Sequence, residues 1–427
     1  MSGVNRIATI NEQLVSNTNP LPVEIGDSGN IDAFARIRVS NPLTLFDSKN
    51  IFKDPDLLDS EENQPLFYDN QEVSGSGTST LYEVNKAQQV LRVGNLVAGK
   101  RLRQTKMRFN YQPGKSMLIL MTFAMSQTAM GITKEEGYGD NNNGVFFRNT
   151  PQGNEFVLRS NATGTPVETI IKQDDWNLNT YEDLDVTKTQ ILIIDMEWLG
   201  VGRVRIGFVK GGVLLYCHQF IHDNTLEVVY MSLPNLPLRS HISNDGTGEE
   251  AFLTQICSTV ISEGGQDKLG KINTFSTNAL VGANVTNTIY ALLGFRLKEN
   301  YKGLAVDILS SAVQISGANK FVEWGIYLNP TVAGTFTYED IPLSGIQVAR
   351  GATANTVTGG SRIAGGYVES GGNAAGSNGS IVSEIQNAIR LGESIAGVRD
   401  YFVLTVKPIF DTIEVNCNGL ITIRELN

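Results

Sequence analysis

The sequence predicts an all-β protein, with two antiparallel β-sandwich domains of a jelly-roll-like kind preceded by an extended N-terminal arm. Short segments with apolar residues at every second position recur along the chain, and clusters of Gly, Asn and Pro separate them. The chain has 427 residues, which is more than one hydrophobic core ordinarily serves. We therefore expect the arm over residues 1–50, the first sandwich over 51–265 and the second sandwich over 266–427.

The first part of the arm, residues 1–30, is rich in turn-forming residues and cannot bury a core by itself. The next segment, Ala33–Ser40, alternates and predicts a short strand. An extended segment follows it as far as Ser48. Four side chains of these two segments are expected to dock the arm on a partner: Phe34, Arg36, Arg38 and Phe46.

Residues 54–80 are acidic and predict loops rather than strands. Their glycine-rich piece, Ser74–Thr78, lacks the lysine and the following helix of a phosphate-binding loop. Around a central meander, alternating segments predict these strands of the first sandwich: Thr80–Val84, Gln89–Val93, Arg101–Tyr111, Ser116–Phe123, Gly144–Arg148, Glu155–Ser160, Glu168–Ile171, Thr225–Ser232 and Ala251–Ser262.

The central meander is predicted over Ile191–Phe220 as three strands. Asp195 and Glu197 share one face of the first strand, and Arg203 and Arg205 share one face of the second. If Glu197 lies opposite Arg203, then Asp195 lies opposite Arg205, and both pairs form cross-strand ion pairs on the outer face. Each pair adds roughly 0.2–1 kcal/mol, so the apolar face dominates the stability of the meander.

The two turns of the meander also have sequence signals. The loop Trp198–Gly202 has two glycines to take positive φ, and Lys210–Gly212 closes a tight hairpin. On the third strand, three residues should continue the core face: Val213, Leu215 and Cys217. Three others should face away from it: Tyr216, His218 and Phe220.

The second sandwich is expected to begin after the polar, glycine-rich stretch Ser262–Lys268. Its predicted strands are Ile289–Leu297, Ala305–Ile315, Phe321–Asn329, Ser344–Arg350, Tyr401–Lys407 and Thr412–Arg424. Gly359–Gly379 predicts exposed loops. Isoleucines then recur at every fourth position, which indicates either a short helix or a strand: Ile381, Ile385 and Ile389.

Composition excludes several classes of partner. The net charge of −10 and the pI near 5.0 argue against nucleic acid. The basic cluster Arg101, Arg103, Lys106 and Arg108 is therefore expected to face an acidic partner surface. No apolar run approaches the roughly 18 residues of a membrane span, and no signal segment begins the chain, so we expect a soluble protein made in a cytosol and no membrane contact. The three cysteines are far apart and predict buried free thiols.

No constellation of residues predicts catalysis, a metal or a cofactor. His218 and His222 are too far apart along a strand to share one ion. Asp195/Glu197 and Asp174/Asp175 are candidate glycosidase pairs, but the facing arginines already explain the first pair. Trp198 and Trp176 are candidate glycan contacts, although packing under a loop is the commoner fate of tryptophan.

Four stretches together resemble a family of tailed-bacteriophage virion structural proteins. They are AFARIRVSNPLTLFDS (Ala33–Ser48), RQTKMRFNYQPGKS (Arg103–Ser116), EWLGVGRVRIGF (Glu197–Phe208) and MSLPNLPLR (Met231–Arg239). The resemblance covers most of residues 33–265 and, more loosely, Ile395–Asp400. It implies an assembled component of a virion with β-sandwich domains, and it transfers no catalytic motif. Residues 1–30 match least.

These observations favour a non-enzymatic virion protein, assembled in the host cytoplasm and contacting other virion proteins. A tail-associated appendage, fibre or adaptor is ahead of a capsid decoration or head fibre. Exposed edge strands would be covered by assembly with copies of itself, and a homotrimer is expected. The alternative is a glycan-binding adhesion module for host attachment, acting through Trp198 or the Gly359–Gly379 loops.

Overall fold

A computed structural model describes residues 9–10, 13–14, 41–51, 67–317, 319–370, 374–379, 390–410 and 414–426. Its regular elements are β-strands with three short 3-10 turns, and the strands pair antiparallel, so the predicted all-β class is confirmed. Residues 1–41 form a unit of their own, in which β1 (Thr9–Ile10) pairs with β2 (Gln13–Leu14). The predicted strand Ala33–Ser40 lies outside the described residues.

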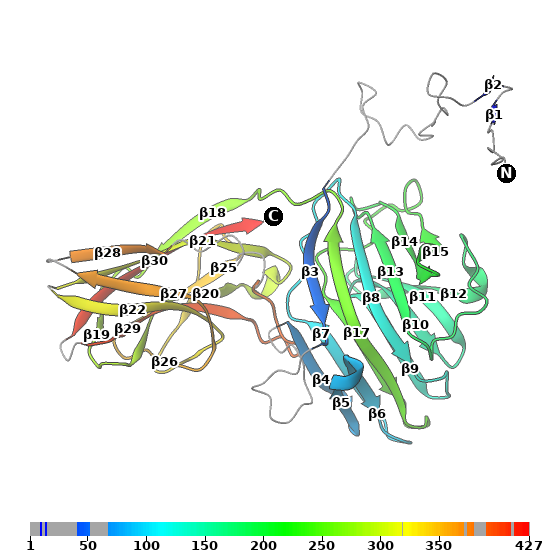
Figure 1. Ribbon diagram of the computed structural model, residues 1–427, viewed down its shortest axis with the longest axis horizontal. Helices are drawn as coiled ribbons and strands as arrows, with labels where there is room; N and C mark the ends of the chain where they lie inside the picture. The colour runs from blue at the N-terminus through cyan, green and yellow to red at the C-terminus, as the bar shows by residue number, and fades with distance from the viewer. Residues whose placement is uncertain are drawn as a thin grey trace, which may run out of the picture. The chain divides into compact units, whose positions relative to one another are not determined.

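The first sandwich has a sheet of seven strands and a sheet of eight (Figure 1). The seven-stranded sheet runs, in spatial order, through β12 (Val167–Lys172), β11 (Gly153–Ser160), β10 (Gly144–Thr150), β9 (Ile132–Gly139), β16 (Leu238–Asn244), β7 (Gly99–Thr105) and β4 (Tyr68–Gly75). The eight-stranded sheet runs through β15 (Val213–Phe220), β14 (Val204–Lys210), β13 (Gln190–Met196), β8 (Met117–Met125), β17 (Ala251–Ser262), β6 (Gln88–Val93) and β5 (Thr78–Glu83), and β3 (Leu43–Lys49) also pairs with β17.

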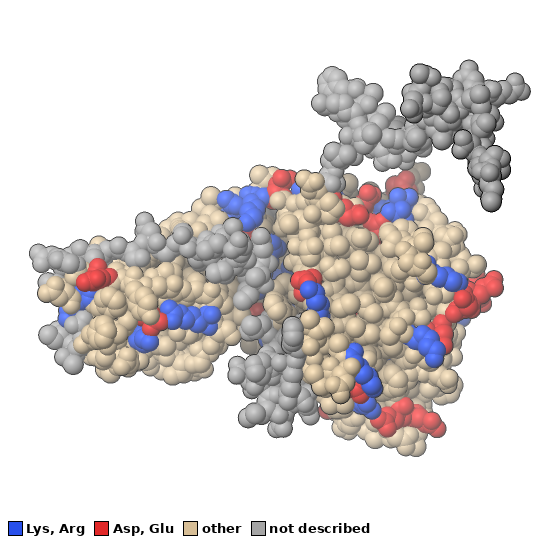
Figure 2. Space-filling model, in the orientation of Figure 1, with Lys and Arg blue, Asp and Glu red and all other residues tan. Residues whose placement is uncertain are grey.

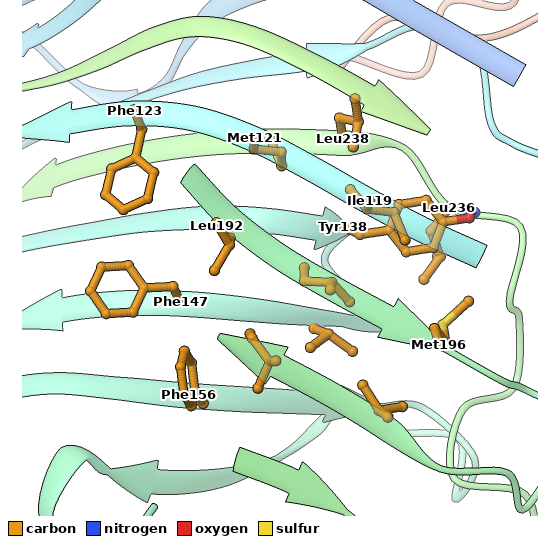
Figure 3. Packing of buried hydrophobic residues seen from close by; sticks show 14 of the residues in the cluster. Ile119, Met121, Phe123, Tyr138, Phe147, Phe156, Leu192, Met196, Leu236 and Leu238 are labelled. Atoms are coloured by element: carbon orange, nitrogen blue, oxygen red, sulfur yellow. Dashed lines mark hydrogen bonds between the residues drawn. The ribbon is translucent and has the colours of Figure 1, made fainter. Parts of the chain in front are cut away.

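The two sheets of the first sandwich pack through side chains that are buried at every second position of their strands. Along β8, alternate residues are buried, and Ile119, Met121 and Phe123 point into the core. Figure 3 shows them packed with residues of the facing sheet such as Tyr138 and Phe147. Burial of each such side chain is worth about 1.5–3 kcal/mol, so this face fixes the sandwich.

Five sequence expectations for the first sandwich fail, and one of them is that β16 was not predicted as a strand. β4 was expected as loop, and β9 was not predicted because its Lys-Glu-Glu run conceals the alternation. β7 ends at Thr105 rather than at Tyr111. Thr225–Ser232 alternates in sequence but is not a strand, since it lies in the connection between β15 and β16.

The meander has the predicted register, with Asp195 opposite Arg205. In its first loop, the positive φ angles belong to Leu199 and Gly200 rather than to both glycines. A bulge in β15 breaks the alternation next to Cys217, which brings Phe220 into the core instead of facing away from it. The predicted hairpin turn is present, with positive φ at both of its glycines.

The second sandwich has a five-stranded and an eight-stranded sheet. The first runs through β18 (Lys271–Ser276), β30 (Val415–Leu426), β21 (Ala305–Ser316) and β28 (Ala374–Gly379), and β19 (Val281–Ala283) also pairs with β30. The second runs through β23 (Thr331–Val332), β26 (Thr356–Thr358), β20 (Ile289–Leu297), β29 (Tyr401–Pro408), β22 (Lys320–Leu328) and β27 (Ser361–Ser370), and β25 (Ile346–Arg350) joins β24 (Tyr338–Asp340) to β20.

The expectation of loops over Gly359–Gly379 is wrong, because β27 and β28 occupy most of this stretch. Its glycines allow close packing: a Cβ at Gly365 would lie 2.0 Å from the Arg362 guanidinium, and one at Gly366 would lie 2.8 Å from Trp324 Nε1. The isoleucine repeat at 381–389 lies outside the described residues.

Each sandwich has its own core. The first core draws on residues between Phe46 and Val260, and the second on residues between Phe275 and Ile423. The predicted boundary falls in the connection between β17 and β18. Within the described residues, no helix is long and apolar enough to cross a membrane.

Candidate ligand-binding groove

The ion pairs predicted in the meander are present only in part. Arg205 pairs with Asp195 and lies over the Tyr216 ring, with 4.4 Å from its guanidinium carbon to the ring centroid. Asp195 was expected on the solvent-exposed face of the sheet, but it is only 5% exposed. The Tyr216 hydroxyl donates a hydrogen bond to its carboxylate at 3.3 Å. Glu197 and Arg203 are exposed, and no ion pair joins these two described residues. Asp195 is therefore a structural carboxylate rather than half of a catalytic pair.

The two candidate tryptophans do not form a sugar-binding platform. Trp176 is 7% exposed and stacks on Phe156, with ring centroids 4.2 Å apart, so its faces are not available to a ligand. Trp198 is half-buried and meets the Tyr111 ring edge-on, and its Nε1 donates to the carbonyl oxygen of Met231 at 2.9 Å. Both tryptophans are packed against other side chains, which is the commoner fate of this residue.

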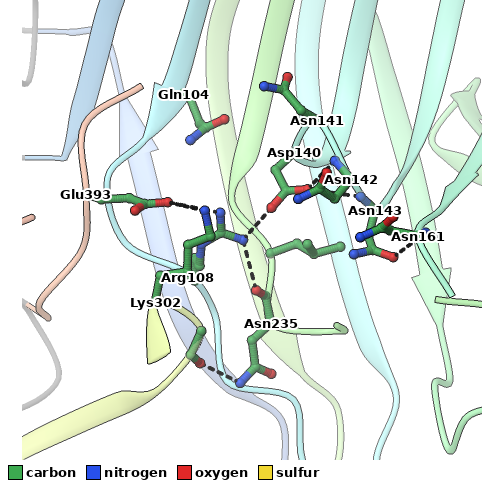
Figure 4. Close-up of polar contacts among 12 residues, drawn as sticks. Gln104, Arg108, Asp140, Asn141, Asn142, Asn143, Asn161, Asn235, Lys302 and Glu393 are labelled. Carbon is green, nitrogen blue, oxygen red and sulfur yellow. Dashed lines mark hydrogen bonds and ion pairs between the residues drawn. The ribbon is translucent and has the colours of Figure 1, made fainter. Parts of the chain in front are cut away.

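Two of the four residues of the predicted basic surface, Arg103 and Arg108, are buried, whereas Arg101 and Lys106 are partly exposed. Arg103 is fully buried, where it donates to Asn70 and Gln255 and lies over the Tyr68 ring. Arg108 is buried as well, because it pairs with Asp140 at 2.8 Å and with Glu393 of the second sandwich at 3.4 Å (Figure 4). On the face drawn in Figure 2, basic and acidic side chains are interspersed.

The remaining predicted contacts are also buried or undescribed. Phe46 is 6% exposed and packs in the first core against Phe67, Tyr68 and Phe109, so it is not free to dock a partner. Phe34, Arg36 and Arg38 lie outside the described residues.

The histidines and cysteines of the meander are structural. His218 packs edge-on against Phe220, and His222 stacks on Tyr230. Among the described residues, no group of three or more His, Cys, Asp and Glu side chains could hold a metal ion. The cysteines are free thiols as predicted: Cys217 and Cys417 are buried, and Cys257 is half-buried.

A groove that the sequence did not predict crosses the outer face of the seven-stranded sheet, the face turned away from the core. It measures about 470 Å³, within the usual size of ligand sites. The same alternation that buries Tyr138, Phe147 and Phe156 on the core side turns polar residues outward from the same strands. The polar and charged side chains that line it come from β7, β9, β10, β11, β12, β16 and the loop after β9: Lys100, Thr133, Glu135, Asn141, Arg148, Thr150, Arg159, Glu168, Arg239 and His241.

One half of the groove is a lattice of ion pairs. Arg148 bonds Glu135 at 2.8 Å and Glu168 at 2.7 Å, and Arg159 bonds the same two glutamates at 3.1 and 2.7 Å. Arg159 also lies over the Phe146 ring at 4.5 Å. Burial alone would raise the pKa of Glu168, but the two arginines outweigh it and lower that pKa. This half is therefore held by shared ion pairs, and the carboxylate of Glu168 is kept in its ionised state.

The other half of the groove has cations without carboxylates. Arg239 donates to two amide oxygens, at 2.8 Å to Gln104 and at 2.7 Å to Asn141. Among the described residues, Lys100 has no hydrogen-bond or ion-pair partner, and the buried His241 Nε2 has none either. Burial and the neighbouring arginines lower the pKa of Lys100, although Glu135 opposes them. Burial and the same cations hold the pKa of His241 well below its usual value, so this imidazole is neutral at pH 7.

The groove continues beyond Lys100. A second cavity of about 440 Å³ shares Lys100 and Thr133 with the first and is lined further by polar groups such as Ser243 and Asn244. The two cavities together form an elongated polar channel along one face of the sheet. Such a channel suits an extended ligand with many hydroxyl groups better than a compact apolar one.

Sequence reasoning could have found part of this groove. Arg239 and His241 are two residues apart in sequence. On a strand, residues two apart share one face, so this spacing alone would place both side chains on the same side of a sheet. The approach of Lys100 to them depends on the pairing of β7 with β16, which separates Lys100 from His241 by more than a hundred residues in sequence. No local pattern carries that information.

The chain matches no protein-family model and no curated protein. Among solved structures, a glycoside hydrolase family protein from Mycobacterium thermorestibile is similar over 51% of this chain and 99% of its own, with 11% identity and a TM-score of 0.37. The carbohydrate-recognition domain of Emp47p is similar over 49% of this chain and 93% of its own, with 13% identity and a TM-score of 0.32. A pseudo β-1,3-glucanase of Mycobacterium tuberculosis has 10% identity and a TM-score of 0.36, over 51% of this chain and 98% of its own. At such scores these likenesses establish neither a common fold nor a common ligand.

Proposed function

We propose that this chain is a non-enzymatic glycan-binding protein, and that the groove on the outer face of the seven-stranded sheet is its binding site. The observation that carries the proposal is an elongated channel lined by hydroxyl, amide and charged groups fixed on strands. Rigid, planar polar side chains recognise the hydroxyl groups of a saccharide by directed hydrogen bonds. The two groove glutamates are shared by Arg148 and Arg159, so neither is placed to act as a general acid.

A blocking substitution tests this proposal. Thr133 lines both cavities, so Thr133→Trp should obstruct the channel and abolish retention of the full chain on immobilised bacterial surface polysaccharides. Thr180→Trp adds the same side chain on an exposed loop and should bind like the wild type. Loss of binding in both variants, or in neither, would remove the groove as the glycan site.

A second candidate function is that of a tailed-phage virion component, tail-associated rather than capsid-associated. The observation in its favour is that the stretches that resemble virion proteins gather in one place. Phe46 packs on Phe109, Tyr111 packs on Trp198, and Trp198 bonds the backbone of Met231. Residues far apart in the sequence thus form one structural unit, as expected if the resemblance follows a common architecture.

The two candidate functions are compatible, because an adhesion module on a virion appendage would combine both. Quantitative mass spectrometry of purified particles tests the second one: a low copy number per particle indicates a tail position, a high one indicates capsid decoration, and absence removes this function. Sedimentation of the purified chain tests the proposed homotrimer.

A further inference from the structure

We propose that the groove binds an acidic saccharide, and that Lys100, His241 and Arg239 form the subsite for its carboxylate or sulfate group. This inference rests on the proposed glycan-binding function and adds the class of sugar. It starts from the charge of the groove rather than from its shape.

The lining of the groove carries a net positive charge, although the net charge of the whole chain is negative. Four permanent cations line it, Lys100, Arg148, Arg159 and Arg239, against two glutamates, Glu135 and Glu168, which leaves +2 (4 − 2). Glu155, which contacts Arg148 from outside the lining at 3.4 Å, reduces this excess to +1 (2 − 1). The whole chain carries −10, so the positive charge is local and selects an anionic ligand.

The excess charge is not spread evenly. Both lining glutamates bond Arg148 and Arg159, which are therefore neutralised within the groove. Arg239 has only neutral amide partners, although it is 6% exposed. Burying a cation without an anion is costly, and an anionic group of a ligand would remove that cost.

The three subsite residues lie on paired strands. Lys100 is opposite Ser243, and Arg239 is opposite Gln104, so His241 lies between these positions on β16. Lys100 is diagonal to His241, within about 8 Å, and Arg239 is two residues from His241 on the same face of β16, so His241 is the central group of the subsite and the two long cationic side chains flank it. His241 Nε2 is buried, lacks a partner among the described residues and belongs to the lining of the groove.

The titration of the subsite agrees with this geometry. Burial is the main cause that lowers the pKa of Lys100 and the pKa of His241. The cations Arg239, Arg159 and Arg148 lower both pKa values further, and for Lys100 the nearby Glu135 acts in the opposite direction. A bound anion would oppose this repulsion, so binding should raise both pKa values and favour uptake of a proton by His241, because Lys100 already carries its charge. Saccharide binding through hydroxyl groups alone has no such effect.

Isothermal titration of the full-length protein tests the inference with one matched pair of ligands. The probes are a hexameric uronic-acid oligosaccharide and the same hexamer with its carboxyl groups reduced to alcohols. We expect the acidic hexamer to bind at least about tenfold more tightly, since a charged hydrogen bond is worth about 1.5–3 kcal/mol. A sulfated hexamer in a parallel titration shows which acidic group is preferred.

The matched variants are Lys100→Ala in the groove and Lys172→Ala, an exposed lysine on β12 outside the lining. Lys100→Ala should lower the affinity for the acidic hexamer about tenfold more than that for the reduced hexamer, whereas Lys172→Ala should change neither. His241→Gln should abolish proton uptake, measured as the dependence of the binding enthalpy on buffer ionisation.

The outcomes separate this inference from the function on which it rests. Equal affinity for the two hexamers overturns the acidic-sugar inference and supports glycan binding. Inorganic sulfate binding as tightly as the sulfated hexamer overturns it too, because the site would then recognise an anion alone. Absence of binding to every saccharide, including those in the polysaccharide panel, overturns both proposals.

Discussion

Both sandwiches place a glutamate shared by two cations on the outer face of a sheet, and the two clusters differ in depth. In the first sandwich, the side chains of Glu135, Arg148 and Arg159 are 2, 11 and 12% exposed. In the second, the glutamate of the cluster is 13% exposed and its two cations are 37 and 31% exposed: Glu323, Arg362 and Lys407. Water screens the second cluster and hardly reaches the first. Depth, rather than residue type, should therefore decide what each cluster contributes.

The largest effect should come from removing the shared acid. Glu135→Ala leaves Glu168 as the one carboxylate shared by Arg148 and Arg159 in a site with little water, and we expect a loss of about 3 kcal/mol in the free energy of unfolding. Glu323→Ala removes the same group from a cluster whose cations are about a third exposed, and should cost about 0.5–1 kcal/mol. Urea denaturation, followed by circular dichroism, measures both losses.

Equal losses in these two variants would contradict the argument from depth. High salt provides a further control, because 1 M NaCl should weaken the contribution of Glu323 far more than that of Glu135.

The next effect compares two buried aspartates whose pKa values shift in opposite directions. Burial raises the pKa of Asp140, but Arg108 and the amides of Asn143 and Asn142 outweigh it, so the net shift is downward. Burial also raises the pKa of Asp400, and its hydrogen-bond donors do not offset this, so the net shift is upward. Asp140 therefore stabilises the protein above its unfolded pKa and loses this effect as the pH falls through its folded pKa. The contribution of Asp400 is complete below its unfolded pKa and is lost as the pH rises through its folded pKa.

Neutral substitutions should expose these opposite signs. Asp140→Asn should cost about 2 kcal/mol at pH 7, and this deficit should shrink toward pH 2. Asp400→Asn should improve relative to the wild type as the pH rises from 3 to 7. Denaturant midpoints at a series of pH values measure both trends, and parallel trends would show that the assigned partners do not control the two groups.

Period-two patterning predicted those strands in which one face is apolar, such as β8, β13 and β20. It failed at β9, where Lys134 and Glu136 occupy the core side. The amine of Lys134 is satisfied by the backbone of Ser126 and Gln127, and burial raises the pKa of Glu136 to about 8, so that side chain is largely neutral at pH 7. A residue that is ionisable in the sequence can thus be neutral when it is buried in the folded protein.

The candidate site was less predictable than the fold. Arg103 and Arg108 were expected at a basic surface but are buried. The sequence does not reveal that Arg103 bonds Asn70 and Gln255, or that Arg108 pairs with Asp140. Lys100 and His241 showed no motif at all. Their proximity follows from the register of two strands distant in sequence, and local periodicity sets which face a residue takes but not which strand lies beside it.

The smallest effect is kinetic and distinguishes the two sandwiches directly. Cys217 belongs to the first core and Cys417 to the second, and burial raises the pKa of each thiol to about 12. A thiol reagent can reach either residue only when its own sandwich opens, because the thiolate is the reactive form. In a Cys257→Ser background, which removes the half-buried thiol, both should react slowly in the native protein. Glu135→Ala should then accelerate the labelling of Cys217 and leave that of Cys417 unchanged, as measured by mass spectrometry of peptides. Equal acceleration at both cysteines would mean that the two sandwiches open as one cooperative unit, held together across contacts such as that of Arg108 with Glu393.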